Sequence, residues 1–163
     1  MKEKRKMKTR ILFVCLGNIC RSPAAEGILK AMVEDKGLQD DFHIDSAGIG
    51  SWHVGDLPDS RMRRHGALRG YDFSSHARQV TSADFSRFDL IIVMDDENYY
   101  DIKRFSTHPA DMMKVHRINE YFIRFQGRPD VPDPYYGGDS DFKLALDLLE
   151  DACQGIINNV MTK

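Results

Sequence analysis

Short apolar runs alternate along the chain with stretches in which apolar positions recur at helical spacing. The run at 11–14, Ile-Leu-Phe-Val, contains no polar position, which is typical of a strand buried on both faces of a parallel sheet. Weaker runs predict three more strands at 42–44, 89–94 and 114–118. Helices are predicted between and after them, at 23–34, 59–69, 82–88, 97–105 and 140–160. This alternation predicts an α/β fold with a mostly parallel sheet.

The segments between these elements are rich in turn residues. Glycine and proline mark two long loops, at 48–58 and 127–138, and the second loop leads into the last helix. Asp139 or Ser140 could cap that helix. No internal repeat interrupts the pattern, so the chain is expected to form one domain.

Size and composition agree with a single soluble domain. The chain has 163 residues, of which 42% are hydrophobic and 29% charged. Three cysteines, an odd number, argue against a disulfide framework and favour a reducing compartment, so we expect a cytoplasmic protein. The longest apolar run covers only 11–16, far short of the ~20 residues of a membrane-spanning helix. No membrane span is expected.

Charge is distributed unevenly along the chain. The first ten residues carry six basic side chains and one acidic one, whereas the remainder carries 17 basic and 24 acidic residues. An acidic body argues against a nucleic-acid partner, because phosphate backbones require clustered Lys and Arg. We therefore expect a flexible basic arm over residues 1–8 and one domain over residues 9–163.

The segment from Cys15 to Pro23 carries the clearest chemical signal. It reads Cys-Leu-Gly-Asn-Ile-Cys-Arg-Ser-Pro, follows the first strand and opens the first helix, for which Ser22 suits a cap and Pro23 the first position. A loop at such a junction gathers backbone N–H groups and the positive end of the helix dipole into an anion site. Gly17 and Asn18 suit the left-handed conformations of such a loop.

Within this loop, Cys15 and Arg21 point to covalent chemistry on an oxyanion. The Arg21 guanidinium can hold two oxygens of a tetrahedral anion. Amides, dipole and Arg21 all favour a thiolate at Cys15, which makes it a nucleophile towards phosphorus, and Ser22 could donate a hydrogen bond to it. The alternative is that Cys15 and Cys20 are small apolar residues beside a turn. Cys20 also raises the hypothesis of a protective disulfide with Cys15.

The segment 14–23, Val-Cys-Leu-Gly-Asn-Ile-Cys-Arg-Ser-Pro, resembles the phosphate-binding loop of the low-molecular-weight protein tyrosine phosphatases, and Ala25-Glu26 continues the match. Downstream, 45–48 (Asp-Ser-Ala-Gly), 94–95 (Met-Asp) and 133–137 (Asp-Pro-Tyr-Tyr-Gly) match in order. The resemblance implies a flavodoxin-like, three-layer α/β/α domain with a four-stranded parallel sheet. It also implies hydrolysis of phosphotyrosine in two steps, without a metal ion or another cofactor. The residues that would bind the phosphate and support the loop are Leu16, Gly17, Asn18, Ile19, Cys20, Arg21 and Ser22.

Asp133 is the expected proton donor. A leaving oxygen must receive a proton, and a carboxylic acid on a loop over the pocket can deliver it. Pro132 and Pro134 restrict the backbone on both sides of Asp133. The resemblance makes Asp133 the general acid of the first step and the base of the second. The alternative is one turn carboxylate among several.

Aromatic residues are expected to wall the cleft. Tyr135 and Tyr136 follow Asp133, and Trp52, the single tryptophan, lies in the other long loop. A deep cleft with aromatic walls would admit phosphotyrosine more readily than phosphoserine. Surface packing or self-association is the alternative for all three residues.

Supporting contacts are implied by the family. There, a serine after the second strand and a histidine further on join the loop asparagine in a hydrogen-bond network. These residues correspond to Ser46, His76 and Asn18, although an ordinary loop position remains open for His76. Asp95 either orients Arg21 or caps the following helix.

Two other functions use similar features. An arsenate reductase would share the oxyanion loop but needs further reactive cysteines, and a catalytically silent phosphopeptide-binding module would need neither nucleophile nor acid. For a phosphatase, the expected partners are tyrosine-phosphorylated proteins, including a tyrosine kinase, and inorganic phosphate as product and inhibitor. The expected assembly is a monomer or weak dimer.

Overall fold

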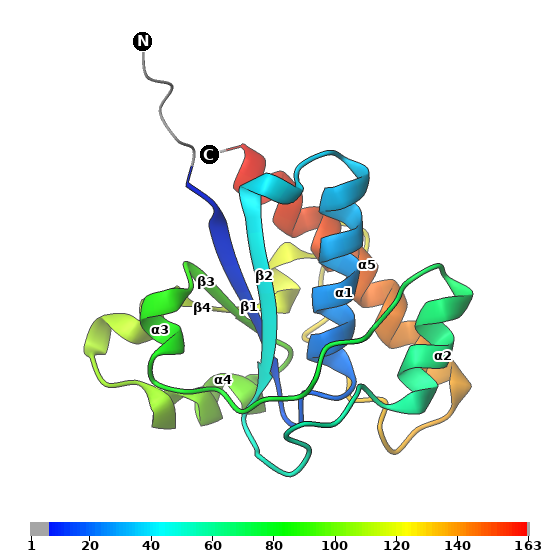
Figure 1. Cartoon of the computed structure of the whole chain (residues 1–163), viewed down its shortest axis with the longest axis horizontal. Coiled ribbons are helices and arrows are strands. Elements are labelled where there is room, and N and C mark those ends of the chain that lie inside the picture. The colour runs from blue at the N-terminus through cyan, green and yellow to red at the C-terminus, as the bar shows by residue number, and fades with distance from the viewer. Residues whose placement is uncertain (1–6, 163) are drawn as a thin grey trace.

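Four parallel strands form the single sheet of the protein, in the order β2-β1-β3-β4 (Figure 1). The computed structural model describes residues 7–162. The strands are β1 (Thr9–Cys15), β2 (Phe42–Gly48), β3 (Leu90–Val93) and β4 (Val115–Arg117). This order, with helices on both faces, confirms the expected flavodoxin-like α/β/α fold.

The apolar run of β1 is continuous because helices cover both faces of the sheet. Ile11 and Phe13 pack on the side of α1 (Arg21–Asp35) and α5 (Asp139–Met161). Leu12 and Val14 pack in a second cluster with side chains near α3 (Asp84–Arg87) and α4 (Asp96–Ile102). Figure 1 shows α1 and α5 on one side of the sheet, with α2 (Ser60–Leu68) beside α5, and α3 and α4 on the other side.

Each observed helix starts one or two residues from its predicted start, and at α1 and α5 the difference changes the expected cap. Helix α1 begins at Arg21, two residues before Pro23, so Ser22 lies inside the first turn and is not its cap. The Ser22 hydroxyl instead contacts side chains of the preceding loop. Helix α5 is preceded by Gly138, whose N–H donates to Asp141 Oδ2, whereas Asp139 pairs with His65. Three short 3-10 helices were not predicted, namely η1 (Gln39–Asp41), η3 (Pro109–Lys114) and η4 (Ile118–Tyr121), whereas η2 (Lys103–Phe105) forms the end of the helix predicted at 97–105.

The sheet places three loops at one edge. Strands β1 and β3 are neighbours, yet the helices that follow them lie on opposite faces, so their loops diverge at the carboxyl ends of the strands. In parallel α/β sheets such a divergence opens a crevice that binds ligands. The loop after β2 begins at the same edge, because Cys15 and Gly48, the last residues of β1 and β2, are paired in register. The segment that begins at Cys15 therefore lies at this crevice.

Two expectations concern the ends of the chain and membranes. Strand β1 starts at Thr9, and residues 1–6 of the expected basic arm lie outside the described residues. Between residues 7 and 162, no helix is long and apolar enough to span a bilayer.

Candidate active site

The loop after β1 has its carbonyl groups bonded and its amides unpaired. The carbonyls of Cys15, Leu16 and Ile19 accept from the N–H groups of Ile49, Gly50 and Asp59, at 3.0, 2.9 and 2.7 Å. Within the described chain, no amide from residue 16 to residue 20 donates to a protein acceptor. Buried N–H groups without partners are rare in folded proteins. Unpaired amides at the N-terminus of α1 form a site for an anion.

Asn18 fixes the shape of this loop. Its backbone is left-handed, with φ of 57°, and its amide nitrogen donates to Ser22 Oγ at 2.7 Å and to Ser46 Oγ at 3.0 Å. Its Oδ1 accepts from the backbone N–H of Arg78 at 3.1 Å. The expectation of a left-handed Gly17 is wrong. A side chain there would instead approach His53, since a Cβ on Gly17 would lie 3.2 Å from His53 Cδ2.

A buried carboxylate sets the direction of the hydrogen bonds beneath Cys15. Ser46 donates to Glu26 Oε1 at 2.6 Å, and Lys30 donates to Glu26 Oε2 at 2.6 Å. Both amide hydrogens of Asn18 are already used, so the Ser22 hydroxyl must be an acceptor towards Asn18 and keeps its own hydrogen. The Cys15 Sγ lies 3.0 Å from Ser22 Oγ, and the one other acceptor of this hydroxyl among the described residues, the Ala47 carbonyl, is farther away at 3.5 Å. The network thus directs a donor at the sulfur.

Arg21 is buried with part of its guanidinium free. Its Nη1 donates to Asp95 Oδ2 at 2.6 Å and to the Val131 carbonyl at 3.0 Å, which uses both Nη1 hydrogens. Neither Nε nor Nη2 is hydrogen-bonded to any residue that the structure describes. Burial opposes the charge on Arg21, but the Cys15 sulfur and the hydrogen bond to Asp95 outweigh it and raise the pKa of Arg21. The edge of the guanidinium that carries Nε and Nη2, its free edge, therefore remains available to bind an oxyanion.

Asp95 has both of the roles that the sequence left open. One carboxylate oxygen holds Arg21, while the other accepts from the N–H of Asn98 at 2.8 Å and caps α4. Since Asp95 follows β3 and Arg21 follows the loop after β1, this pair joins the two diverging loops of the crevice.

Asp133 lies beside the free edge of Arg21. Its Oδ2 is 3.6 Å from Arg21 Nη2, and its Oδ1 accepts from the N–H of Tyr135 at 3.1 Å. Two residues earlier, Val131 donates to the Met94 carbonyl at 3.1 Å and accepts from Arg21. The backbone before Asp133 is therefore anchored to β3 and to Arg21, and one carboxylate oxygen is left facing the guanidinium.

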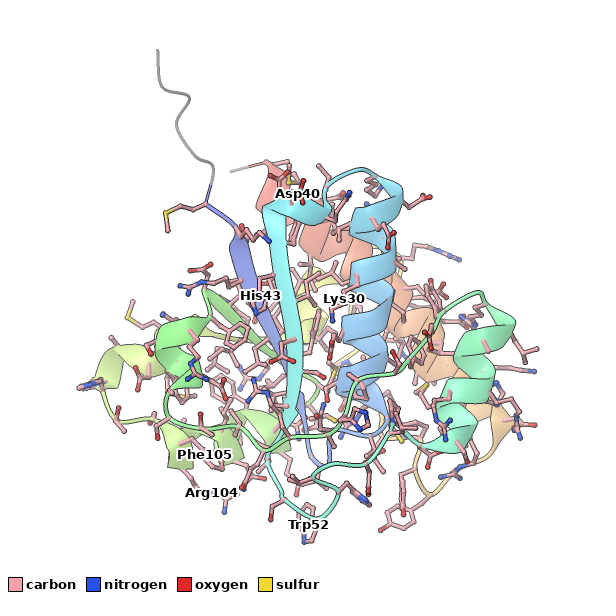
Figure 2. The ribbon with its side chains drawn as sticks, in the orientation of Figure 1. Lys30, Asp40, His43, Trp52, Arg104 and Phe105 are labelled. Carbon is pink, nitrogen blue, oxygen red and sulfur yellow. The ribbon has the colours of Figure 1, made fainter. Side chains whose placement is uncertain are left out.

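A cleft of about 300 Å³ brings these groups together. Cys15, Arg21 and Asp133 all line it, with the aromatic walls expected from the sequence; its other residues are Leu16, Gly17, Ile19, Cys20, Trp52, His53, Tyr135 and Tyr136. Trp52 and Tyr136 are 70% and 94% exposed, so they stand at the mouth. Figure 2 shows Trp52 at the end of the molecule where β1 and β2 finish.

His76 lies away from Asn18 and does not line the cleft. Its Nδ1 is 3.0 Å from the Gly55 carbonyl on an exposed loop, and the backbone of Arg78 bonds to Asn18 instead. The expected contact between His76 and the loop asparagine is therefore wrong, because a main-chain donor fills the place assigned to an imidazole. Ser46 does contact Asn18, as expected.

Three residues that sequence reasoning missed are His53, Glu26 and Arg61. His53 lines the cleft, and Arg61 bonds to the Tyr135 carbonyl. Glu26 had a visible signal, since an acidic residue four positions before Lys30 stands among buried apolar positions of α1. No sequence pattern marked Arg61.

The other two cysteines are buried thiols. Burial and, secondarily, the charge of Asp59 raise the pKa of Cys20 far above its usual value. Cys153 packs in the core, and burial raises its pKa as well. All three cysteines are free. Residues 7–162 contain no cluster of His, Cys, Asp and Glu placed to hold a metal ion.

Comparison with known proteins assigns the family. Residues 10–163 match the family model described as low molecular weight phosphotyrosine protein phosphatase. The chain belongs to this family. It is 48% identical over 153 residues to a Synechocystis protein named for the same family, covering 93% of this chain and 96% of that protein. The low molecular weight protein-tyrosine-phosphatase of Streptomyces coelicolor is 41% identical, with 93% of each chain covered.

Solved structures agree with this assignment. A protein tyrosine phosphatase from Entamoeba histolytica with Hepes in its active site has a TM-score of 0.91 and 41% identity, covering 95% of this chain and 98% of that chain. A Drosophila arginine phosphatase has a TM-score of 0.84 and 33% identity, with coverages of 92% and 96%. The chain is a low molecular weight protein tyrosine phosphatase, a hydrolase of phosphate monoesters.

Ser46→Ala tests the network beneath the phosphatase loop. The substitution leaves one hydrogen of Asn18 and one oxygen of Glu26 without their partner. We expect a loss of stability of about 1–3 kcal/mol in urea unfolding, and a fall of about 10-fold in kcat/KM for p-nitrophenyl phosphate. Ser86→Ala is the control, because the Ser86 hydroxyl bonds only to a carbonyl of its own turn. A folded Ser46→Ala enzyme with unchanged kcat/KM would contradict this role.

Proposed function

We propose that this phosphatase hydrolyses phosphotyrosine through a phosphocysteine on Cys15, with Asp133 as general acid and then general base. The observation that carries the proposal is the meeting, in one cleft, of unpaired loop amides, the free edge of Arg21, the Cys15 sulfur and a carboxylate. Each group matches one requirement of phosphoryl transfer, namely oxyanion binding, nucleophilic attack and proton delivery.

In the first step, Cys15 Sγ attacks phosphorus while the bond from phosphorus to the ester oxygen breaks. The loop amides and the Nε and Nη2 groups of Arg21 bind the non-bridging oxygens, which carry the charge of the transition state. Asp133 delivers its proton to the departing oxygen. Its Oδ1 already accepts the Tyr135 N–H, so Oδ2 is the oxygen that would hold the transferable proton.

In the second step, a water molecule attacks phosphorus and the bond from sulfur to phosphorus breaks. The Asp133 carboxylate, left ionised by the first step, takes the proton from this water. Ser22 donates to the sulfur that leaves, because the network from Glu26 keeps its hydrogen directed there. The products are inorganic phosphate and the restored thiolate.

The two rival functions have less support. An arsenate reductase requires further reactive thiols, but Cys153 is fully buried in the core, and burial raises the pKa of Cys20, which keeps it protonated. A silent binding module requires no proton donor, yet Asp133 is held by contacts on both sides of its loop position. We therefore propose tyrosine-phosphorylated proteins, including a tyrosine kinase, as substrates in the cytoplasm, and inorganic phosphate as product and inhibitor.

Trapping the intermediate tests the nucleophile. Rapid acid quenching during turnover of ³²P-labelled phosphotyrosine peptide should yield labelled protein, with the label on the peptide that contains Cys15. Cys15→Ser should abolish both the label and turnover, because an alcohol is not ionised at neutral pH. Cys153→Ser, at a core position away from the cleft, should retain both. Turnover without labelled protein would contradict a phosphocysteine.

Removing the acid should produce a loss that depends on the leaving group. In Asp133→Ala, kcat/KM for phenyl phosphate should fall by about 10²–10⁴, because phenolate needs a proton as it leaves. The loss should be much smaller for p-nitrophenyl phosphate, whose leaving group is stable as an anion. Equal losses for both substrates would assign proton delivery to another residue.

The aromatic mouth should select the substrate. Trp52→Ala should raise KM for a phosphotyrosine peptide by about 5- to 10-fold, equal to about 1–1.4 kcal/mol of lost ring contact, while kcat stays within about 2-fold. The same peptide carrying phosphoserine or phosphoarginine serves as the comparison for the intact enzyme. A higher kcat/KM for either of these than for phosphotyrosine would overturn the proposed substrate class but not the phosphocysteine chemistry.

A further inference from the structure

Arg61, in the first turn of α2, joins three separate parts of the chain. Its Nε and Nη2 donate to the two oxygens of Asp59 at 3.1 and 3.0 Å, as a bidentate pair. Its Nη2 also donates to the Tyr135 carbonyl at 2.8 Å. The guanidinium carbon lies 4.8 Å from the ring centre of Phe142, in the first turn of α5. Residue 61 thus connects α2 to the loop that carries Asp133.

These contacts continue in both directions to the reacting groups. The Asp59 N–H donates to the Ile19 carbonyl of the phosphate-binding loop at 2.7 Å. At the other end, the Tyr135 N–H donates to Asp133 Oδ1 at 3.1 Å. A continuous series of hydrogen bonds therefore runs from the phosphate-binding loop through Asp59, Arg61 and Tyr135 to Asp133.

The segment after Val131 has little else to hold it. Among the described residues, the bond from Arg61 to Tyr135 is the one hydrogen bond that joins segment 132–137 to a part of the chain outside it. The remaining hydrogen bonds of this segment are local, such as that from Gly137 to the Pro134 carbonyl at 2.8 Å. Without Arg61, no hydrogen bond would tie this segment to the phosphate-binding loop, and the position of Asp133 would depend on Val131, the packing of Pro134 and Tyr135 and the longer contact with Arg21.

We propose that Arg61 is a positioning residue, which holds the general acid at its working distance from the nucleophile by tying the Asp133 loop to the phosphate-binding loop. This inference rests on the proposed function. Arg61 would act only through the position of Asp133, because Arg61 itself does not line the cleft. A displacement of about 1 Å in a reacting group can cost about 10²-fold in rate.

The chemistry of this junction requires an arginine. Its planar fork can bind the Asp59 carboxylate through two groups and still donate to a carbonyl, which an ammonium group on a flexible stem does less well. Burial would raise the pKa of Asp59, but the hydrogen bonds from Arg61 outweigh it and hold that pKa below its usual value. The Asp59 carboxylate therefore stays charged, and the pair intact, across the neutral range.

Leaving-group dependence distinguishes positioning of the acid from general damage. Arg61→Met keeps an unbranched stem beside Phe142 and removes every hydrogen-bond donor of the side chain. We expect kcat/KM for phenyl phosphate to fall by about 10- to 100-fold, with less than about 3-fold loss for p-nitrophenyl phosphate. Arg61→Lys, which keeps the charge and a single ammonium group as donor, should recover part of the loss. Thermal unfolding and circular dichroism establish that each variant is folded.

A double variant gives the decisive comparison. If Arg61 acts through Asp133, adding Arg61→Met to Asp133→Ala should lower kcat/KM for phenyl phosphate by less than about 2-fold, because the positioned group is already gone. Arg69→Met is the matched control. Arg69 caps the same helix and pairs with Asp147 and Glu150 of α5, away from the cleft, so both substrates should be affected little and equally.

Failure of this inference differs from failure of the proposed function. Equal losses for both substrates in Arg61→Met, or full additivity with Asp133→Ala, would overturn the role of Arg61 alone. Absence of leaving-group dependence in Asp133→Ala itself would overturn the proposed acid, and with it any positioning role for Arg61.

Discussion

The unpaired amides of the loop after β1 are the constraint on which the rest of the site depends. Leaving a buried N–H without a partner costs about 1–3 kcal/mol, so such a loop persists only if its surroundings hold it in place. Here the loop carbonyls bond outwards to segments after β2 and before α2, and Asn18 takes a left-handed backbone that its own side chain stabilises. The loop is thereby prevented from satisfying its amides internally, and they remain available to an anion.

Two hydrogen-bonded systems meet at this loop from opposite sides. Beneath it, the buried Glu26 carboxylate fixes the directions of the Ser46, Asn18 and Ser22 hydrogens, and the last of these faces the Cys15 sulfur. Above it, Arg61 links the loop to the backbone that carries Asp133. Each system contains a charged pair, Glu26 with Lys30 or Asp59 with Arg61. A charged group in a network removes the choice of direction that neutral hydroxyls and amides would otherwise have.

Local chemistry could be predicted from the sequence, whereas contacts between distant segments could not. The buried strand before Cys15, the anion loop and the acid between two prolines are features of adjacent residues. For Asp95 the sequence allows two roles because nothing local chooses between them, and the fold uses both of its oxygens. The hydrogen bond from Arg61 to the Tyr135 carbonyl joins residues 74 positions apart in the sequence. The partner of Asn18 Oδ1 is the main-chain N–H of Arg78, and the type of that residue gives no signal of the contact. His76 was misassigned for this reason.

The structure separates a fixed reaction centre from an open rim. Asp133 lies between two tertiary anchors, Val131 on one side and Tyr135 on the other, and Arg21 is held through both hydrogens of one nitrogen. Under the proposed function these groups are in place before substrate arrives, so the reaction needs little reorganisation. Trp52 and Tyr136, by contrast, are mostly exposed and contact the cleft only at its mouth. Under the proposed function, changes in these rings alter which phosphorylated side chain enters and leave the phosphoryl-transfer geometry intact, because that geometry is anchored through the main chain of Val131 and Tyr135 and the side chains of Asp95 and Arg61.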